Sequence, residues 1–188
     1  IIKALLGAAN CAAVPLQILA ENRFAAAELF GKLANIAGDL DARGIRQTDI
    51  FKMATGGDPI MAERKNCHPF TFTPFATFIF AANEAPISSD QTDAWFDRWL
   101  VVPLERRIPD DEVDPHLTAK LTTPDELAGL LVLAVEGLRR LVKRGKFDLP
   151  EPVSQAGDIY RDRLDTVRGF LNEACVIELD GWTPRAAR

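Results

Sequence analysis

The chain has 188 residues, of which 47% are hydrophobic and 26% charged, and its net charge is −5 at neutral pH. This composition excludes a disordered chain and is typical of a globular domain with its own core. The acidic balance argues against a generally basic surface that coats nucleic acid, so any DNA contact is expected to be local. The longest apolar runs, residues 75–82 and 127–135, fall short of the roughly 20 residues of a membrane-spanning helix, so we expect no membrane partner.

Cysteine and histidine are too sparse and too scattered to predict a metal centre. Cys11, Cys67 and Cys175 show no paired spacing, and only His68 and His116 could join them. Cys67 and His68 are adjacent, but nothing nearby completes a tetrahedral set. We therefore expect ordinary reduced cysteines in a cytoplasmic protein.

The first third of the chain alternates helical and strand patterns. Residues 1–6 are typical of the end of a helix, and residues 16–30, rich in Leu, Ala and Glu, predict a second helix. The apolar run at residues 33–37 predicts a buried strand. Two carboxylates, Asp39 and Asp41, follow this strand directly.

A helix and a β-hairpin are predicted next. The helix covers residues 48–54, and two glycines after it suit a helix stop. The hairpin has arms at residues 59–63 and 69–73. Arg64 and Lys65 then lie near its tip.

Two further apolar runs, residues 75–82 and 99–104, predict strands, the first of them covered on both faces. Strands that alternate with helices indicate an α/β fold with a mainly parallel sheet, whose ligands lie beyond the carboxyl ends of the strands. Asp39, Asp41 and Asn83 all fall at such ends.

The remainder of the chain is predicted to be helical. Residues 124–144 form a strongly amphipathic pattern, and residues 152–174 predict a further helix after a loop that contains proline. Together they suggest a helical cap beside the sheet. The expected division is a core at residues 1–108 and a helical subdomain at residues 109–188.

The polar side chains after the strands are of the types that a Mg-nucleotide site uses. Mg²⁺ prefers oxygen ligands, which Asp39 and Asp41 would supply, and a carboxylate also orients the attacking water. Asn83 at a strand tip would bridge a phosphate and that water. The alternatives are a solvated acidic loop for the aspartates and an ordinary turn for Asn83.

Two basic positions suggest contacts with a neighbouring subunit and with DNA. Arg98 would reach a neighbour's γ-phosphate as an arginine finger; the alternative is a surface ion pair with Asp93 or Asp97. Lys65, beside Arg64, would meet a DNA phosphate. The alternative for this tip is a solvated loop lysine.

Three segments, in order, resemble the C-terminal helicase domain of phage and plasmid primases. They are LQILAENRFAAAELFGKLANIAGDLDA, FKMATGGDPIMAERK and TFIFAANEAPISSDQTDAWFDRWLVVP. That family belongs to the superfamily 3 helicases and is related to poxvirus and papillomavirus replicative helicases. The similarity covers about residues 14–103.

This resemblance implies an AAA+-like P-loop ATPase core and a role for each candidate residue. Asp39 and Asp41 match the Walker B acids, which bind Mg²⁺ and ATP, and Asn83 matches the motif C sensor. Lys65 ends the family's hairpin motif, and Arg98 matches the arginine finger. The resemblance also implies a homo-hexamer that drives a DNA strand through a central channel during replication initiation, with a primase domain as an optional part of the same chain.

The sequence departs from the family in two places. Where many relatives have paired arginines, this chain has Asp97 followed by Arg98. It also contains no G-x-x-x-x-G-K-[ST] loop, since Gly31-Lys32 and Gly145-Lys146 lack the rest of the motif. By resemblance, that loop is expected immediately upstream of Ile1, and a DNA-binding region is expected to follow the C-terminus.

Three functions remain open at this point. The first is a fragment of an ATP-dependent replicative DNA helicase, with little or no ATP hydrolysis by this piece alone. The second is a non-catalytic prophage remnant or an oligomerisation module that keeps the fold. The third, a small-molecule α/β enzyme, lacks both a Gly-rich fingerprint and a nucleophile arrangement.

Overall fold

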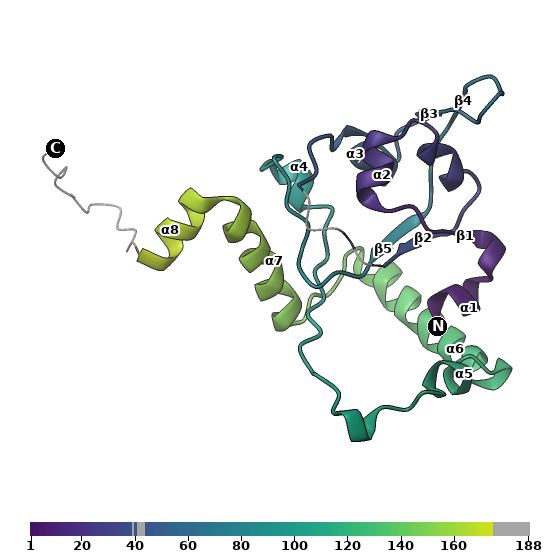
Figure 1. The fold of residues 1–188 in the computed structure, drawn as a ribbon. Helices are drawn as coiled ribbons and strands as arrows, with labels where there is room; N and C mark the ends of the chain where they lie inside the picture. The colour runs from purple at the N-terminus through teal and green to yellow at the C-terminus, as the bar shows by residue number, and fades with distance from the viewer. Residues whose placement is uncertain (39, 41–43, 175–188) are drawn as a thin grey trace, which may run out of the picture.

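A small parallel sheet forms the centre of the protein in the computed structural model, which describes residues 1–38, 40 and 44–174 (Figure 1). Its strands have the order β1-β2-β5 and lie at Cys11–Ala12, Ala34–Ala37 and Thr77–Phe80. A separate antiparallel pair consists of β3 (Ile60–Ala62) and β4 (Phe70–Phe72). The predicted α/β class and the parallel sheet are confirmed.

Helices surround this sheet on both sides. They are α1 (Ile2–Leu6), α2 (Leu16–Glu21), α3 (Asp49–Gly56), α4 (Asp93–Phe96), α5 (Leu117–Leu121), α6 (Pro124–Arg144), α7 (Glu151–Leu164) and α8 (Thr166–Ala174), with short 3-10 turns η1 (Ala8–Asn10), η2 (Ala25–Leu29) and η3 (Asp110–Glu112). In the view of Figure 1, α2 and α3 lie above the sheet, and α1 and α6 lie below it. No helix in the described part of the chain is long and apolar enough to cross a membrane.

Two groups of buried side chains hold α2, α3 and the sheet together. One joins α2 and η2 to the root of the hairpin through Leu19, Leu29 and Ile60. The other surrounds Trp95, which is fully buried and packs against the Phe51 ring of α3. Burial of large apolar side chains of this kind is the main force that stabilises such a fold.

A buried asparagine fixes the path of the chain beside the sheet. Asn35 on β2 has no exposed surface. Its Oδ1 accepts a hydrogen bond from the Val14 backbone N–H at 2.8 Å, and its Nδ2 donates to the Val14 carbonyl at 2.9 Å. Because an unpaired buried amide is costly, this two-way pairing holds the segment between β1 and α2 against β2.

Several predicted elements are confirmed. The strand at residues 33–37 is β2, and the two arms of the predicted hairpin are β3 and β4. The helix at residues 48–54 is α3, which ends at Gly57 with the left-handed φ of 80° that glycine allows. The long helix is α6, and it likewise ends at a left-handed glycine, Gly145.

The strand predicted at residues 99–104 is wrong. These residues pair with no strand in the described part of the chain, and Leu104 is 91% exposed. An apolar run becomes a strand only where a sheet edge is free to pair with it. The neighbouring run, residues 75–82, forms β5 only over Thr77–Phe80, and the side chains of this strand are half-buried or exposed rather than covered on both faces.

The two long helices predicted outside α6 are each interrupted. In the run at residues 16–30, α2 ends at Glu21, and the Asn22 side chain then accepts a hydrogen bond from the Phe24 N–H at 2.9 Å. In the run at residues 152–174, Asp165 separates α7 from α8 and accepts from the Arg168 N–H at 3.0 Å. Short polar side chains of this type favour turns over helix continuation because they bond to the nearby backbone.

Candidate functional site

The carboxyl edge of the parallel sheet brings together the chain segments that leave β2 and β5. Beyond the strand ends, the Ala81 N–H donates to the Ala37 carbonyl, and the Leu40 N–H donates to the Ala81 carbonyl, each at 3.1 Å. Asn83 follows two residues later and is exposed. Asp39 and Asp41, predicted to bind Mg²⁺ and ATP, lie outside the described residues.

Helix α7 reaches this edge directly beside Asn83. The Glu84 carboxylate accepts a hydrogen bond from Arg163 of α7 at 2.5 Å. This bond and the charge of Arg163 hold the pKa of Glu84 below its ordinary value. The C-terminal helices therefore contact the segment that carries the predicted sensor.

A buried hydroxyl anchors α7 to the same segment. The Tyr160 hydroxyl donates to the Pro86 carbonyl at 2.8 Å and accepts from the Trp95 indole N–H at 3.1 Å. Burial raises the pKa of Tyr160 to about 12. The side chain of Gln91 adds a bond of 2.6 Å to the Leu164 carbonyl at the end of α7.

A polar cluster links the segment after Asn83 to α3. The Asp90 carboxylate accepts from the Lys52 ammonium at 2.7 Å, from the Thr48 hydroxyl at 2.7 Å and from the Thr92 hydroxyl at 2.6 Å. These hydrogen bonds lower the pKa of Asp90 far below its ordinary value, and the bond from Lys52 contributes most. Asp90 is thus an ionised carboxylate that connects its own segment to the first turn of α3 through hydrogen bonds to Thr48 and Lys52.

Arg98, the predicted arginine finger, lies against α3. Its Nε donates to the Lys52 carbonyl at 3.4 Å, and its Nη1 donates to the Ala94 carbonyl. Asp93, one alternative partner, forms its ion pair with Arg161 instead. Among the described residues Arg98 forms no ion pair, and its half-buried guanidinium is held by backbone carbonyls.

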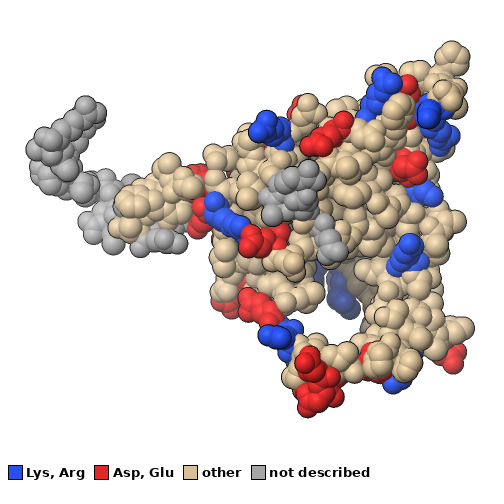
Figure 2. Space-filling view, in the orientation of Figure 1, with Lys and Arg blue, Asp and Glu red and all other residues tan. Residues whose placement is uncertain are grey.

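The hairpin carries the predicted DNA-binding pair and separates its two members. Figure 1 shows β3 and β4 extending from the body, and Figure 2 shows Lys and Arg side chains at that end of the molecule. Lys65 is exposed in the turn, which the Cys67 N–H closes by donating to the Arg64 carbonyl at 3.0 Å. The Arg64 guanidinium lies over the Phe70 ring, 5.1 Å from its centroid.

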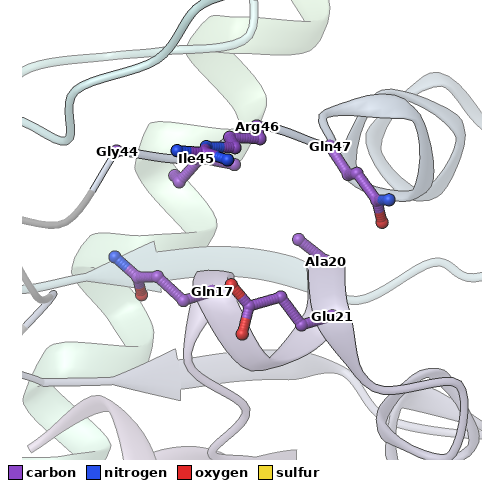
Figure 3. Close-up of a pocket in the computed structure, with 7 residues that line it drawn as sticks. All are labelled: Gln17, Ala20, Glu21, Gly44, Ile45, Arg46 and Gln47. Carbon is purple, nitrogen blue, oxygen red and sulfur yellow. The ribbon is translucent and has the colours of Figure 1, made fainter.

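A hollow in the surface lies away from these residues. It has a volume of about 260 Å³ and separates α2 from residues 44–47. Figure 3 shows Gln17 and Glu21 on α2 at one side of this hollow and Arg46 in the segment on its other side. Neither Asn83 nor Arg98 lines it.

The described residues contain no group of side chains that could hold Mg-ATP by themselves. No three His, Cys, Asp or Glu side chains within residues 1–38, 40 and 44–174 gather closely enough to hold a metal ion. Asn83 offers one amide oxygen at the sheet edge, and the sequence contains no Gly-rich phosphate loop. The described donor set is therefore insufficient by itself to hold the nucleotide.

Sequence reasoning missed the residues that organise this region. Lys52 and Asp90 are 38 positions apart, and Tyr160 lies 74 positions from Pro86. No spacing rule within one element connects such pairs. The one available signal was that Tyr160 is the single tyrosine of the sequence and is followed four residues later by Leu164, which is one apolar stripe on a helix rich in charged residues.

Residues 1–99 match DUF5906, described as a family of unknown function. The match covers more than half of the 188 residues. The chain belongs to DUF5906. The DUF5906 region contains both sheets and the segment from Asn83 to Arg98, whereas α6, α7 and α8 lie outside it. No curated protein matches the chain.

Proposed function

We propose that this chain is part of the ATPase core of a superfamily 3 DNA helicase of the phage and plasmid primase type, with an AAA+-like fold. One observation carries the proposal: a hairpin that ends in an exposed lysine is inserted between two strands that are neighbours in the parallel sheet. In this proposal the tip contacts DNA, and the insertion connects it to the strand ends where nucleotide ligands lie in α/β folds. Lys65 is the residue at that tip.

In this proposal the nucleotide site lies at the carboxyl edge of the sheet. Asp39 and Asp41 hold Mg²⁺ and orient water, and Asn83 lies on the segment that leaves the adjacent strand. The proposal requires a Gly-rich phosphate loop, which residues 1–188 do not contain. We propose that this loop belongs to the same parent protein and precedes α1.

In this proposal Arg98 acts across a subunit boundary. It follows α4, on the segment that begins at Asn83, and its guanidinium is only half-buried. Its bond to the Lys52 carbonyl is long at 3.4 Å, so a phosphate from a neighbouring subunit would compete well with it. This role implies a ring, which we propose is a homo-hexamer in the cytoplasm with DNA in its channel.

A non-catalytic binding module is the second candidate. The absence of a G-x-x-x-x-G-K-[ST] loop from residues 1–188 favours it. It keeps the same fold and subunit contacts without hydrolysis. A primase domain in the same chain is compatible with both candidates.

ATP hydrolysis tests the proposal when the chain is made with and without its native upstream residues. We expect turnover that depends on DNA only in the longer protein, and its loss by on the order of a thousandfold in Arg98→Ala. Mixing Arg98→Ala with Asp39→Ala subunits is expected to restore part of the activity. No turnover by the longer protein under any condition would favour the non-catalytic module.

A further inference from the structure

An aromatic cluster at the base of the hairpin lies against Arg64, one of the two predicted DNA-binding residues. Phe30, just after η2, presents its ring edge-to-face to Phe70 at 5.4 Å and to Phe72 at 5.3 Å. Phe70 and Phe72 are both on β4 and are stacked at 5.7 Å. Three rings thus form a cluster that connects the hairpin to η2.

The Arg64 guanidinium covers this cluster. Its Cζ lies 5.1 Å from the centroid of Phe70 and 5.7 Å from that of Phe30. Both distances are within the roughly 6 Å at which a cation interacts with an aromatic face. A planar guanidinium suits this position better than an ammonium because it stacks on rings.

A second contact holds the same side of the hairpin. The Arg23 Nε lies 3.3 Å from the Glu63 carboxylate, so the residue before Arg64 is tied to the segment before η2. Lys65 makes no ion pair among the described residues and extends into solvent. Arg64 is therefore in contact with protein side chains, whereas the adjacent Lys65 is free to bind a ligand.

We infer that Arg64 is a positioning residue, which clamps the hairpin onto η2 through Phe30 and Phe70 so that Lys65 meets the DNA backbone. The inference rests on the proposed function for its DNA partner, but the clamp itself does not. Arg64 then contributes to affinity by ordering the tip and makes no phosphate contact of its own.

Measuring DNA binding by the 188-residue chain distinguishes a residue that positions the hairpin from one that contacts a phosphate. A labelled oligothymidine is titrated at several salt concentrations, and the slope of log K against log salt falls by about 0.7 for each phosphate of a single strand that the protein no longer neutralises. We expect Lys65→Met to reduce the slope by that amount. Arg64→Met is expected to weaken binding about two- to five-fold at every salt concentration with the slope unchanged.

Two further variants leave the net charge of the chain unchanged and make the test more specific. Phe30→Leu removes one ring of the clamp and no charge, and it is expected to weaken binding as much as Arg64→Met does. Arg64→Lys keeps the charge but loses the planar stacking, so its affinity is expected to resemble that of Arg64→Met. A reduced slope in Arg64→Met that Arg64→Lys restores, with Phe30→Leu unchanged, would overturn the inference.

Limited trypsin digestion without DNA tests the clamp independently of the proposed function. Cleavage of the Lys65–Asn66 bond is expected to be about two- to five-fold faster in Arg64→Met and in Phe30→Leu, and no faster in the double variant than in either single one. Arg107→Met, an exposed arginine away from the hairpin, serves as the matched control. Unchanged cleavage in both variants refutes the clamp, whereas a wild-type chain that fails to bind DNA refutes only the proposed function.

Discussion

The ammonium of Lys52 lies 2.7 Å from the carboxylate of Asp90, and this ion pair joins α3 to the segment that begins at Asn83. Helix α3 leads directly into β3 of the hairpin. The pair is well shielded, with the Asp90 side chain 12% and the Lys52 side chain 26% exposed. It is therefore a shielded polar connection between the segment that follows β5 and the helix that leads into the hairpin.

Replacing Asp90 with Asn is expected to lower the free energy of unfolding by about 1–3 kcal/mol at neutral pH, because the Lys52 ammonium loses a charged acceptor in a shielded site. Urea unfolding at constant ionic strength measures the effect. Asp49→Asn is the matched control, since Asp49 lies 3.8 Å from the same ammonium but is 89% exposed. The control is expected to change stability by less than about 0.5 kcal/mol.

The effect of Asp90 on stability also depends on pH. Its pKa in the folded protein is below the ordinary value of 3.8, so the folded state favours the ionised form. The contribution is fully present above the unfolded pKa and is lost as the pH falls through the folded pKa. The stability difference between wild type and Asp90→Asn is expected to narrow below about pH 4, and a constant difference down to strongly acidic pH would contradict this assignment.

Tyr160 is the only tyrosine in the sequence, so its ionisation is observable by tyrosinate absorbance without interference. Burial raises its pKa in the folded protein to about 12, against an ordinary value of 10.0. A raised pKa means that the neutral phenol is stabilising below pH 10 and that this stability is lost as the pH rises toward 12. In urea the apparent pKa is expected to return to about 10.

A titration of folded protein with an apparent pKa near 10 would show that Tyr160 is not buried against Pro86 and Trp95. Tyr160→Phe provides the companion measurement. It removes the hydroxyl that bonds to both groups and is expected to cost about 1–3 kcal/mol, because the Pro86 carbonyl and the Trp95 N–H lose their partner.

Local sequence patterns predicted the elements that are stabilised locally. Gly57 and Gly145 end α3 and α6 because their left-handed backbone is an intrinsic property of glycine. The run at residues 33–37 predicted β2 because the side chains of a buried strand are mostly apolar, and its one polar residue, Asn35, is hydrogen-bonded to Val14. The same rule failed at residues 99–104, where Trp99 turns inward to stack on Phe51 and the rest of the run finds no sheet edge.

The candidate site was predictable only where its residues follow a strand or a turn. The positions of Asn83 beyond β5 and of Lys65 in the hairpin turn were predictable because each follows a recognisable strand pattern, and the roles of both residues stay predictions. The different environments of Arg64 and Lys65 could not be predicted, since they depend on Phe30, which lies more than 30 positions earlier. Strand β1 was missed because two residues carry no periodic signal.

The same glycine-to-alanine change is expected to have opposite effects at two helical positions. Gly57 has φ 80°, so Gly57→Ala places a side chain in the left-handed region and is expected to destabilise the protein by about 1–2 kcal/mol. Gly129 lies within α6, and a methyl group added there would meet no atom within 4 Å, so Gly129→Ala is expected to stabilise that helix by up to about 1 kcal/mol. Thermal unfolding followed by circular dichroism measures both, and equal effects at the two positions would contradict the assigned backbone of Gly57.

Asn35 offers the sharpest test of how the core is organised beside the sheet. Asn35→Leu keeps the number and branching of the side-chain heavy atoms but can neither accept from the Val14 N–H nor donate to its carbonyl. Both backbone groups are then buried without a partner, and the expected cost is about 2–5 kcal/mol. Asn83→Leu, at an exposed position, is the matched control and is expected to cost less than about 0.5 kcal/mol.

Because Asn35→Asp keeps the acceptor but loses the donor, its stability is expected to improve on acidification, when the protonated acid regains a donor for the Val14 carbonyl. If the stability of Asn35→Asp only decreases as the pH is lowered, the Nδ2 bond contributes little.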